Sequence, residues 1–182
     1  MSEESSRRVV LVLGGVRSGK SRYAQELAAR GKRVAFIATA EAGDDEMRQR
    51  IARHRDERPA SWTTLEAPLA LENALLEAGK NCDTILVDCL TVWTANVMQS
   101  GSHEDVVTLA DRLANTLRAV PASVILVSNE VGSGIVPDNE LGRAYRDLLG
   151  AVNQRVAAAA DEVVLLVAGC PLIIKQPAEA LA

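Results

Sequence analysis

A glycine-rich stretch near the amino terminus has the residue types and the spacing of a phosphate-binding loop. The stretch fits the pattern G-x-x-x-x-G-K-[ST] and consists of Gly14, Gly15, Val16, Arg17, Ser18, Gly19, Lys20 and Ser21. Such a loop brings several backbone N–H groups onto one anion, and side chains at the glycine positions would obstruct that approach. We expect Lys20 to reach the β- and γ-phosphates of a nucleotide, Arg17 to add a cation, and Ser21 to be a ligand of Mg²⁺.

The context of this stretch favours phosphate binding over the alternative, a glycine-rich turn without a ligand. The apolar run 9–13 directly before it is typical of a buried strand, and the residues from Lys20 onward are typical of a helix. That helix would add the positive end of its dipole to the anion site. The pattern therefore predicts a bound nucleotide, although it does not define the reaction.

Polar residues also follow two further apolar runs. Asp88 follows the run 84–87, where a P-loop enzyme carries the second acidic ligand of its magnesium site. The alternative is that Asp88 caps the turn after a strand. Thr39, Ala40 and Glu41 follow the preceding run and could line the edge of the nucleotide.

His54 lies on the apolar face of a helix predicted over residues 45–55. Met47 and Ile51 precede it on the same face, so His54 is expected to point toward the body of the protein. A lone histidine on such a face is more often a packed core residue than a functional group. Two arginines, Arg55 and Arg58, follow it closely and suit a phosphate.

The composition predicts one compact domain. The chain has 182 residues, is 48% hydrophobic and carries a formal net charge of −4, which is enough apolar material to close a sizeable core. We expect a polar extension at residues 1–8 and a single nucleotide-binding domain at 9–182. The sequence lacks the stripe of Lys and Arg that would predict a nucleic-acid partner. No stretch is long and apolar enough for membrane insertion, so we expect a cytoplasmic location.

The three cysteines lack the spacing of metal ligands. Cys82, Cys89 and Cys170 are also odd in number. We expect reduced and mostly buried thiols, with neither a zinc site nor a disulfide.

Apolar runs alternate with segments of helical period along the chain. The predicted strands span residues 9–13, 34–38, 84–87, 124–127, 163–167 and 172–174. The predicted helices span residues 20–29, 45–55, 70–78, 104–120 and 141–160. The strand runs are continuous, which is typical of strands covered on both faces. Together they predict an α/β fold with a mostly parallel, doubly wound sheet and a ligand beyond the carboxyl ends of the strands.

Several separated motifs follow one another in order from residue 9 to residue 175. Besides the glycine-rich loop they are Ile37-Ala38-Thr39, Asp45-Glu46-Met47, His54-Arg55, Arg58-Pro59, Asn129-Glu130-Val131-Gly132, Gly134-Ile135-Val136-Pro137, Arg146-Asp147 and Asn153-Gln154. This set resembles the bifunctional adenosylcobinamide kinase and adenosylcobinamide-phosphate guanylyltransferase family of cobalamin biosynthesis. The resemblance implies a RecA-like P-loop NTPase fold, with helices on both faces of a mostly parallel sheet, and a homotrimer.

The same resemblance implies two successive reactions. The hydroxyl of the aminopropanol arm of adenosylcobinamide is first phosphorylated from ATP or GTP. GMP then moves from GTP onto adenosylcobinamide phosphate through a guanylyl-histidine, which gives adenosyl-GDP-cobinamide and pyrophosphate. The histidine of the family motif corresponds to His54.

The nucleotide contacts of the family correspond to a larger set of positions in this chain. Besides the loop at 14–21 they are Thr39, Ala40, Glu41, His54, Arg55, Asp56, Glu57, Glu66 and Asp88. Ser21 and Asp88 are expected to hold Mg²⁺. Glu66 is expected to recognise guanine, since a carboxylate can accept hydrogen bonds from guanine's N1 and exocyclic amine.

Two other functions stay open at this point. A P-loop kinase of another small alcohol would transfer phosphate without a covalent nucleotide, and His54 would then be a core residue. A nucleotide-switched assembly protein would hydrolyse nucleotide slowly and change only its oligomeric state. The general base of the kinase step is also open between Asp88 and Glu130.

Overall fold

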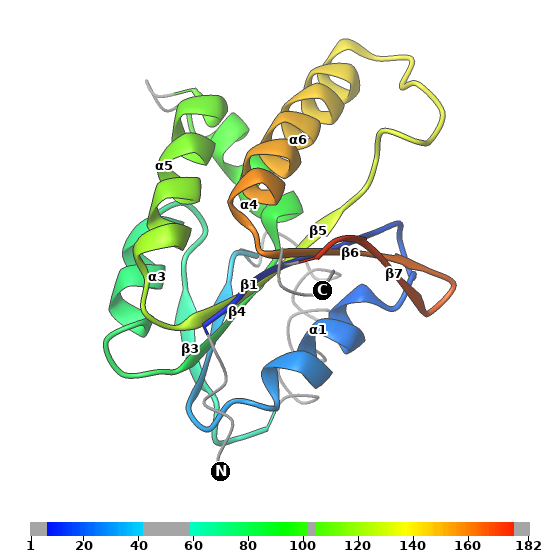
Figure 1. Cartoon of the computed structure of the whole chain (residues 1–182). Helices are drawn as coiled ribbons and strands as arrows, with labels where there is room; N and C mark the ends of the chain where they lie inside the picture. The colour runs from blue at the N-terminus through cyan, green and yellow to red at the C-terminus, as the bar shows by residue number, and fades with distance from the viewer. Residues whose placement is uncertain (1–6, 42–58, 102–104, 177–182) are drawn as a thin grey trace.

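A computed structural model describes residues 7–41, 59–101 and 105–176. These residues form a sheet with helices on both of its faces (Figure 1). The strands are β1 (Val9–Gly14), β2 (Val34–Ala38), β3 (Thr63–Glu66), β4 (Thr84–Asp88), β5 (Ser123–Asn129), β6 (Glu162–Val167) and β7 (Cys170–Lys175). The helices are α1 (Lys20–Ala28), α3 (Leu71–Ala78), α4 (Leu90–Gln99), α5 (Val106–Ala119) and α6 (Glu140–Ala159).

The sheet has the strand order β3-β2-β4-β5-β1-β6-β7. All neighbouring strands pair in parallel except β7, which runs antiparallel to β6. The mostly parallel α/β sheet predicted from the sequence is therefore confirmed. The strand β1 lies inside the sheet between β5 and β6, so the loop that follows it begins at the carboxyl edge.

The described helices are divided unequally between the two faces of the sheet. In Figure 1, α1 lies below the sheet, whereas α3, α4, α5 and α6 lie above it. We call these the α1 face and the α5–α6 face. Side chains alternate between them along each strand: Val10 and Val12 of β1 belong to the apolar cluster of the α1 face, and Leu11 belongs to the cluster of the other face.

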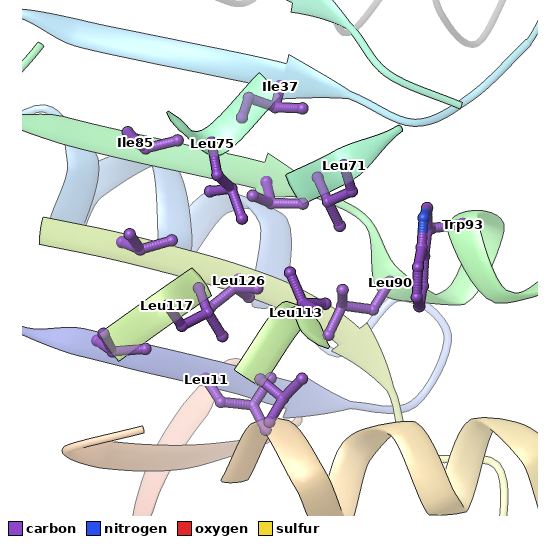
Figure 2. Packing of buried hydrophobic residues seen from close by; sticks show 14 of the residues in the cluster. Leu11, Ile37, Leu71, Leu75, Ile85, Leu90, Trp93, Leu113, Leu117 and Leu126 are labelled. Carbon is purple, nitrogen blue, oxygen red and sulfur yellow. The ribbon is translucent and has the colours of Figure 1, made fainter. Parts of the chain in front are cut away.

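The α5–α6 face holds the larger core. Figure 2 shows long side chains from the strands meeting leucines of α3 and α5, with Trp93 of α4 at one end. Val106, Ala110, Leu113 and Leu117 recur along α5 at the spacing of one helix face, and all four are buried. Burial of this apolar stripe is what holds α5 against the sheet.

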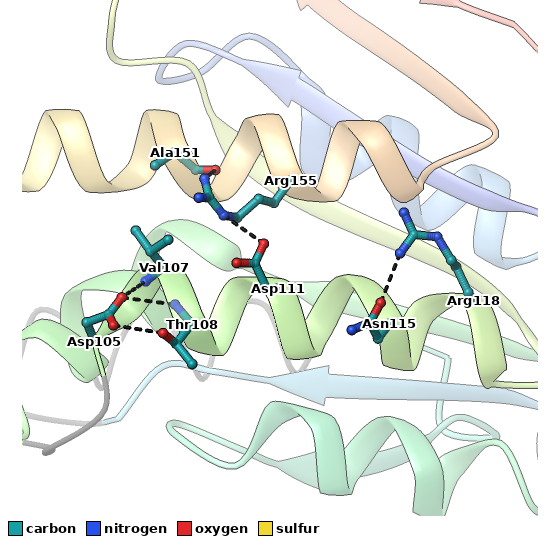
Figure 3. Close-up of polar contacts among 8 residues, drawn as sticks. All are labelled: Asp105, Val107, Thr108, Asp111, Asn115, Arg118, Ala151 and Arg155. Atoms are coloured by element: carbon teal, nitrogen blue, oxygen red, sulfur yellow. Dashed lines mark hydrogen bonds and ion pairs between the residues drawn. The ribbon is translucent and has the colours of Figure 1, made fainter.

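Polar contacts fix the start of α5 and its pairing with α6. The Asp105 carboxylate accepts hydrogen bonds from the backbone N–H groups of Val107 and Thr108, both at 2.9 Å, and so caps the helix (Figure 3). Arg155 of α6 lies 2.9 Å from Asp111 of α5. Both side chains of this ion pair are partly exposed, so it contributes less than about 1 kcal/mol.

Two elements were missing from the sequence-based prediction. The strand β3 is short and mostly exposed, with the sequence Thr-Thr-Leu-Glu, so it has no apolar run. The helix α4 begins directly after the turn at Cys89 and is rich in β-branched and aromatic residues, which have low helix propensity. Burial of Leu90, Trp93 and Val97 against the core overrides that propensity.

Three other expectations need correction or lie outside the described residues. The strand predicted at 172–174 exists within β7, but all six residues of β7 are exposed, so this strand is not covered on both faces. The thiols were expected to be mostly buried, yet Cys170 is exposed and Cys82 is only half-buried. Cys89 keeps some exposed surface as a residue, but it packs against the apolar cluster of the α1 face, so its thiol is largely shielded from water. The helix predicted over 45–55 lies outside the described residues.

None of the helices in the described part of the chain combines the length and the apolar content needed to cross a membrane.

Candidate functional site

The strand register lines up the predicted site residues along the carboxyl edge of the sheet. Gly14 of β1 pairs with Asn129 of β5, and Ala38 of β2 pairs with both Asp88 of β4 and Glu66 of β3. All five residues therefore end their strands at the same edge, where parallel α/β sheets bind ligands.

The glycine-rich stretch forms a tight loop between β1 and α1. Arg17 and Gly19 have positive φ angles of 57° and 94°, and the Nζ atom of Lys20 donates to the carbonyl of Gly15 at 3.0 Å. Gly19 caps α1 without a side-chain hydrogen bond from the described residues. The first-turn N–H groups of α1 thus face the loop in the arrangement that binds anions.

A glycine is required at the first position of the loop. A Cβ atom on Gly14 would lie 2.4 Å from Oγ of Ser18 and 2.8 Å from the carbonyl oxygen of Leu166. Ser18 itself is 8% exposed, whereas Val16 at the tip of the loop is 83% exposed. The loop is therefore folded down onto β1 at one side and open to solvent at its tip.

Asp88 ends β4 on the α1 face. Leu86 belongs to the cluster of that face and Val87 to the opposite one, so alternation places Asp88 beside α1 and its first residue, Lys20. Burial first and the Asp88 carboxylate second raise the pKa of the neighbouring Cys89 thiol to about 11, and Lys20 acts in the opposite direction. The charges of Lys20 and Asp88 thus both lie close enough to Cys89 to shift its pKa.

The donor atoms of Ser21 and Asp88 suit magnesium. A hydroxyl and a carboxylate are hard oxygen ligands, and Mg²⁺ in nucleotide sites commonly takes one or two protein ligands, with water and phosphate oxygens completing its shell. The described residues contain no group of three or more His, Cys, Asp or Glu side chains that could hold a metal ion. The protein can thus contribute to a nucleotide-bound Mg²⁺ site, whose remaining ligands would come from the nucleotide and water.

Thr39 holds the ends of β2 and β4 together. Its hydroxyl donates to the carbonyl of Cys89 and accepts from the Cys89 N–H, both at 2.8 Å, and Thr39 is fully buried. Asn96 of α4 donates to the Thr39 carbonyl at 2.8 Å. The Thr39 hydroxyl therefore positions the segment after Asp88. The residues that follow, Ala40 and Glu41, are half-buried and exposed respectively.

Glu66 does not lie beside the phosphate loop. It is exposed at the end of β3, and three strands separate β3 from β1. At about 4.8 Å per strand, the two strand ends are roughly 19 Å apart. The structure thus brings Lys20, Ser21 and Asp88 toward one site and leaves Glu66 at the far end of the same edge. His54, Arg55, Asp56 and Glu57 lie outside the described residues.

The turn between β6 and β7 supports the loop and was missed at the sequence level. Ala168 and Gly169 both have positive φ angles, 51° and 81°, which is typical of a two-residue type I′ turn. The Gly169 N–H donates to the Ser18 carbonyl at 2.9 Å. A Cβ atom on Gly19 would lie 3.3 Å from Cα of Gly169. The available signal was the glycine between two apolar runs.

A polar network behind β5 was also missed. The buried Ser128 hydroxyl donates to Oδ1 of Asn153 on α6 at 2.7 Å, and Asn153 Nδ2 donates to the Asn129 carbonyl at 3.0 Å. The Asn129 N–H donates to Oγ1 of Thr91 on α4 at 2.8 Å. Tyr145 of α6 donates to the Thr91 carbonyl at 2.9 Å, and burial raises the pKa of this phenol to about 12. Two helices thus fix the end of β5.

The loop after β5 is fastened at its base and exposed at its tip. The Glu130 carboxylate accepts from the N–H groups of Gly132 and Ser133 at 2.6 and 3.1 Å. Arg146 of α6 donates to the Gly132 carbonyl. Ile135 at the tip is 97% exposed. Glu130, one of the two candidate bases, is therefore engaged by its own loop.

Solved structures share this fold at low sequence identity. An ATPase from the type III secretion system of pathogenic bacteria matches with a TM-score of 0.56 and 14% identity over 87% of this chain. The P4 protein of bacteriophage phi6 in complex with ADP matches with a TM-score of 0.50 and 12% identity over 94% of this chain. The chain spans 50% and 56% of those two structures. The fold is thus the RecA-like P-loop NTPase fold predicted from the sequence.

Curated relatives are similar over nearly their whole length. The bifunctional adenosylcobalamin biosynthesis protein CobP of Pseudomonas aeruginosa is 46% identical, with 91% of this chain and 96% of the relative covered. The protein CobU of Salmonella typhimurium, with the same description, is 41% identical, with 92% and 99% covered. The family model described as cobinamide kinase / cobinamide phosphate guanyltransferase matches residues 10–174. The chain therefore belongs to this family of bifunctional enzymes of cobalamin biosynthesis.

Proposed function

We propose that the chain phosphorylates the aminopropanol hydroxyl of adenosylcobinamide from ATP or GTP and then transfers GMP from GTP to adenosylcobinamide phosphate. The observation that supports this most directly is the phosphate loop at 14–21, set beside Asp88 on the α1 face of a chain whose family model carries both activities. The loop suits a nucleoside triphosphate, and family membership supports the corrinoid as the second substrate.

In the kinase step, the loop N–H groups and Lys20 bind the β- and γ-phosphates and stabilise the charge that develops during transfer. Arg17 adds a positive charge at the loop. Ser21 and Asp88 would hold Mg²⁺, which would neutralise charge on the triphosphate when bound. The end of β4 is kept in place for this by the Thr39 hydroxyl.

In the transferase step, we propose that His54 attacks the α-phosphate of GTP. A nitrogen–phosphorus bond forms, the bond to the bridging oxygen breaks, and pyrophosphate leaves with that electron pair. The phosphate of adenosylcobinamide phosphate then attacks the same phosphorus and releases the histidine. The imidazole must be neutral for the first attack, because only then does a ring nitrogen carry a free lone pair.

The remaining proposed nucleotide contacts are Thr39, Ala40, Glu41, Arg55, Asp56, Glu57 and Glu66. Glu66 is proposed to accept hydrogen bonds from guanine, and its exposed position at the end of β3 leaves it accessible. Glu66→Gln should weaken the preference for GTP over ATP in the transferase step. An unchanged preference would contradict this role.

We also propose a homotrimer as the working assembly. Its support is the family membership and an exposed apolar edge: Leu172, Ile173 and Ile174 of β7 are 56%, 46% and 55% exposed. Exposed apolar surface of this kind is typical of an interaction site. Size-exclusion chromatography with light scattering measures the mass directly, and a monomer at micromolar concentration would contradict the proposal.

The experiment that tests the function uses GTP labelled in its α-phosphate. Purified protein with Mg²⁺ should acquire label that is acid-labile and alkali-stable, as a phosphoramidate is, and His54→Ala should acquire none. Lys20→Ala should lose cobinamide phosphorylation by about 10²–10³-fold, the usual scale for one electrostatic group. Phosphorylation without protein labelling would favour the alternative, a P-loop kinase without a covalent intermediate.

A further inference from the structure

Asn129 lies beside the phosphate loop at the carboxyl edge of the sheet. It is the last residue of β5 and pairs with Gly14, the first residue of the loop. Val127 belongs to the cluster of the α1 face, and the Ser128 hydroxyl bonds Asn153 on the opposite face. Alternation therefore directs the Asn129 side chain to the α1 face, where Asp88 and Lys20 also lie.

The backbone of Asn129 is held from two helices. Its N–H donates to Thr91 of α4 at 2.8 Å, and its carbonyl accepts from Asn153 of α6 at 3.0 Å. Glu130, the next residue, donates its N–H to the Gly14 carbonyl at 3.1 Å. The fold thus fixes the direction of the Asn129 side chain through these main-chain contacts, which is how a site residue is pre-organised.

The side-chain oxygen of Asn129 is buried without a donor. Its Oδ1 atom has no hydrogen-bond partner among the residues that the structure describes. A buried amide oxygen without a donor is unfavourable, and such an atom in a functional site calls for a ligand. The missing partner must be a hydrogen-bond donor.

The groups that meet in the kinase step restrict which donor could bond to Asn129 Oδ1. The phosphates of a nucleotide offer acceptor oxygens and no N–H. The alcohol that receives the γ-phosphate carries an O–H, and it must approach the phosphate that the loop holds. Water, free or metal-bound, is another donor that could reach this site.

We infer that Asn129 Oδ1 accepts a hydrogen bond from the acceptor hydroxyl of the corrinoid in the kinase step, an inference that rests on the proposed function. The hydrogen bond turns the O–H toward Oδ1 and leaves an oxygen lone pair facing the γ-phosphorus. The oxygen–phosphorus bond forms as the β–γ bridge breaks, the nucleoside diphosphate leaves with the bridging electron pair, and the proton passes to solvent. Asn129 binds and orients the hydroxyl and does not take its proton.

The test compares the binding of two corrinoids, cobinamide and an analogue that lacks the terminal hydroxyl. Their dissociation constants are measured by equilibrium dialysis with Mg²⁺ and a non-hydrolysable ATP analogue at saturation. The parent protein should bind the hydroxylated corrinoid about tenfold more tightly, which corresponds to about 1.4 kcal/mol. Asn129→Ala should bind both equally, and Asn129→Asp, which keeps an acceptor oxygen, should retain the preference.

A matched control separates this role from a structural one. Asn153→Ala removes the same side-chain type from the opposite face and breaks the bonds to Ser128 and Asn129. It should lower the melting temperature, and the preference should fall by less than in Asn129→Ala, because the amide stays in place and Thr91 still holds the Asn129 N–H. Asn129→Ala should melt near the parent because the folded contacts of Asn129 are made by its backbone.

Three outcomes would overturn the inference in distinguishable ways. A tenfold preference in Asn129→Ala would show that the hydroxyl bonds elsewhere. A raised Mg²⁺ requirement with an unchanged preference would assign the amide to a metal-bound water. A parent protein that neither phosphorylates cobinamide nor takes label from GTP would remove the proposed function itself.

Discussion

The two faces of the sheet end in polar residues of opposite character. On the α5–α6 face, Thr39 follows β2 and Ser128 precedes the last residue of β5. Both are fully buried, and their hydroxyls donate to the Cys89 carbonyl and to Asn153. On the α1 face, Asp88 and Asn129 close β4 and β5 beside Lys20, and the Asn129 amide oxygen is buried without a donor from the described residues. The α5–α6 face, which has the larger described core, thus fixes the positions of the strand ends. The α1 face, with its single described helix, carries the proposed chemistry.

The division predicts that substitutions on the two faces differ in what they damage. Changes on the α5–α6 face should lower stability, whereas changes at the carboxyl ends of the α1 face should lower activity. If Lys20→Ala lowered the free energy of unfolding by more than it raised the activation free energy of the reaction, this division between the faces would be wrong.

The largest stability effect is expected in the core of the α5–α6 face. Leu113→Ala removes a fully buried side chain from α5 and should lower the free energy of unfolding by about 2–5 kcal/mol. Leu141→Ala, at a residue that is 66% exposed on α6, is the control and should change it by less than about 0.5 kcal/mol. Urea denaturation measures both, and equal effects would contradict the assignment of the core.

Alkaline pH should reveal the desolvated thiol of Cys89. Burial, with help from Asp88, raises its pKa from 9.0 to about 11, so the folded state holds the proton more tightly than the unfolded state. Stability from this group is complete below pH 9 and is lost as the pH rises toward 11, by roughly 2–3 kcal/mol.

Denaturation between pH 8 and pH 10 tests this. Cys89→Ala should flatten the loss, and Cys170→Ala, at an exposed thiol, should leave it unchanged. Tyr145 adds a similar loss only above pH 10, because burial raises its pKa from 10.0 to about 12. A parent that is equally stable at pH 8 and pH 10 would refute the prediction.

Thr39→Val tests whether the Thr39 hydroxyl holds the ends of β2 and β4 together. The substitution keeps the shape of the side chain and leaves the N–H and carbonyl of Cys89 without their partner, so we expect a loss of about 1–3 kcal/mol. Thr39→Ser keeps the hydroxyl and should lose less. Identical melting temperatures for the two variants would mean that the hydroxyl does not hold the strands together.

The smallest effect is expected at the turn beneath the loop. Gly169→Ala forces a side chain into a φ of +81° and should cost about 1–2 kcal/mol. It should also raise the KM for nucleotide severalfold, because the Gly169 N–H supports Ser18. Gly150→Ala in α6 meets no atom within 4 Å and should instead stabilise by about 0.5–1 kcal/mol. A nucleotide KM that responds equally to both variants would show that the turn does not support the loop.

The sequence predicted the elements whose pattern is local and strong. The apolar runs of β1, β2, β4, β5 and β6 mark buried parallel strands, and the loop at 14–21 follows a fixed spacing. The short polar β3 and the β-branched α4 carry no such local signal, because pairing with β2 and burial of Trp93 decide them.

The candidate site was predictable in part for the same reason. Lys20 and Ser21 are defined by their own motif and Asp88 by the strand before it. The roles of Asn129, Thr91, Asn153 and Gly169 depend on contacts between segments far apart in the chain. Such contacts have no spacing in the sequence. His54 lies outside the described residues, so its role stays a prediction.

The central position of β1 has a consequence for the synthesis of the protein. Its two neighbours in the sheet are β5 and β6, so Val9 pairs with Val124, and the loop bonds Gly169. During synthesis β1 thus waits for partners that are made more than a hundred residues later. Such long-range pairing is slow to form. A nascent chain therefore acquires its supported nucleotide loop only after β5, β6 and the turn at Gly169 have been made.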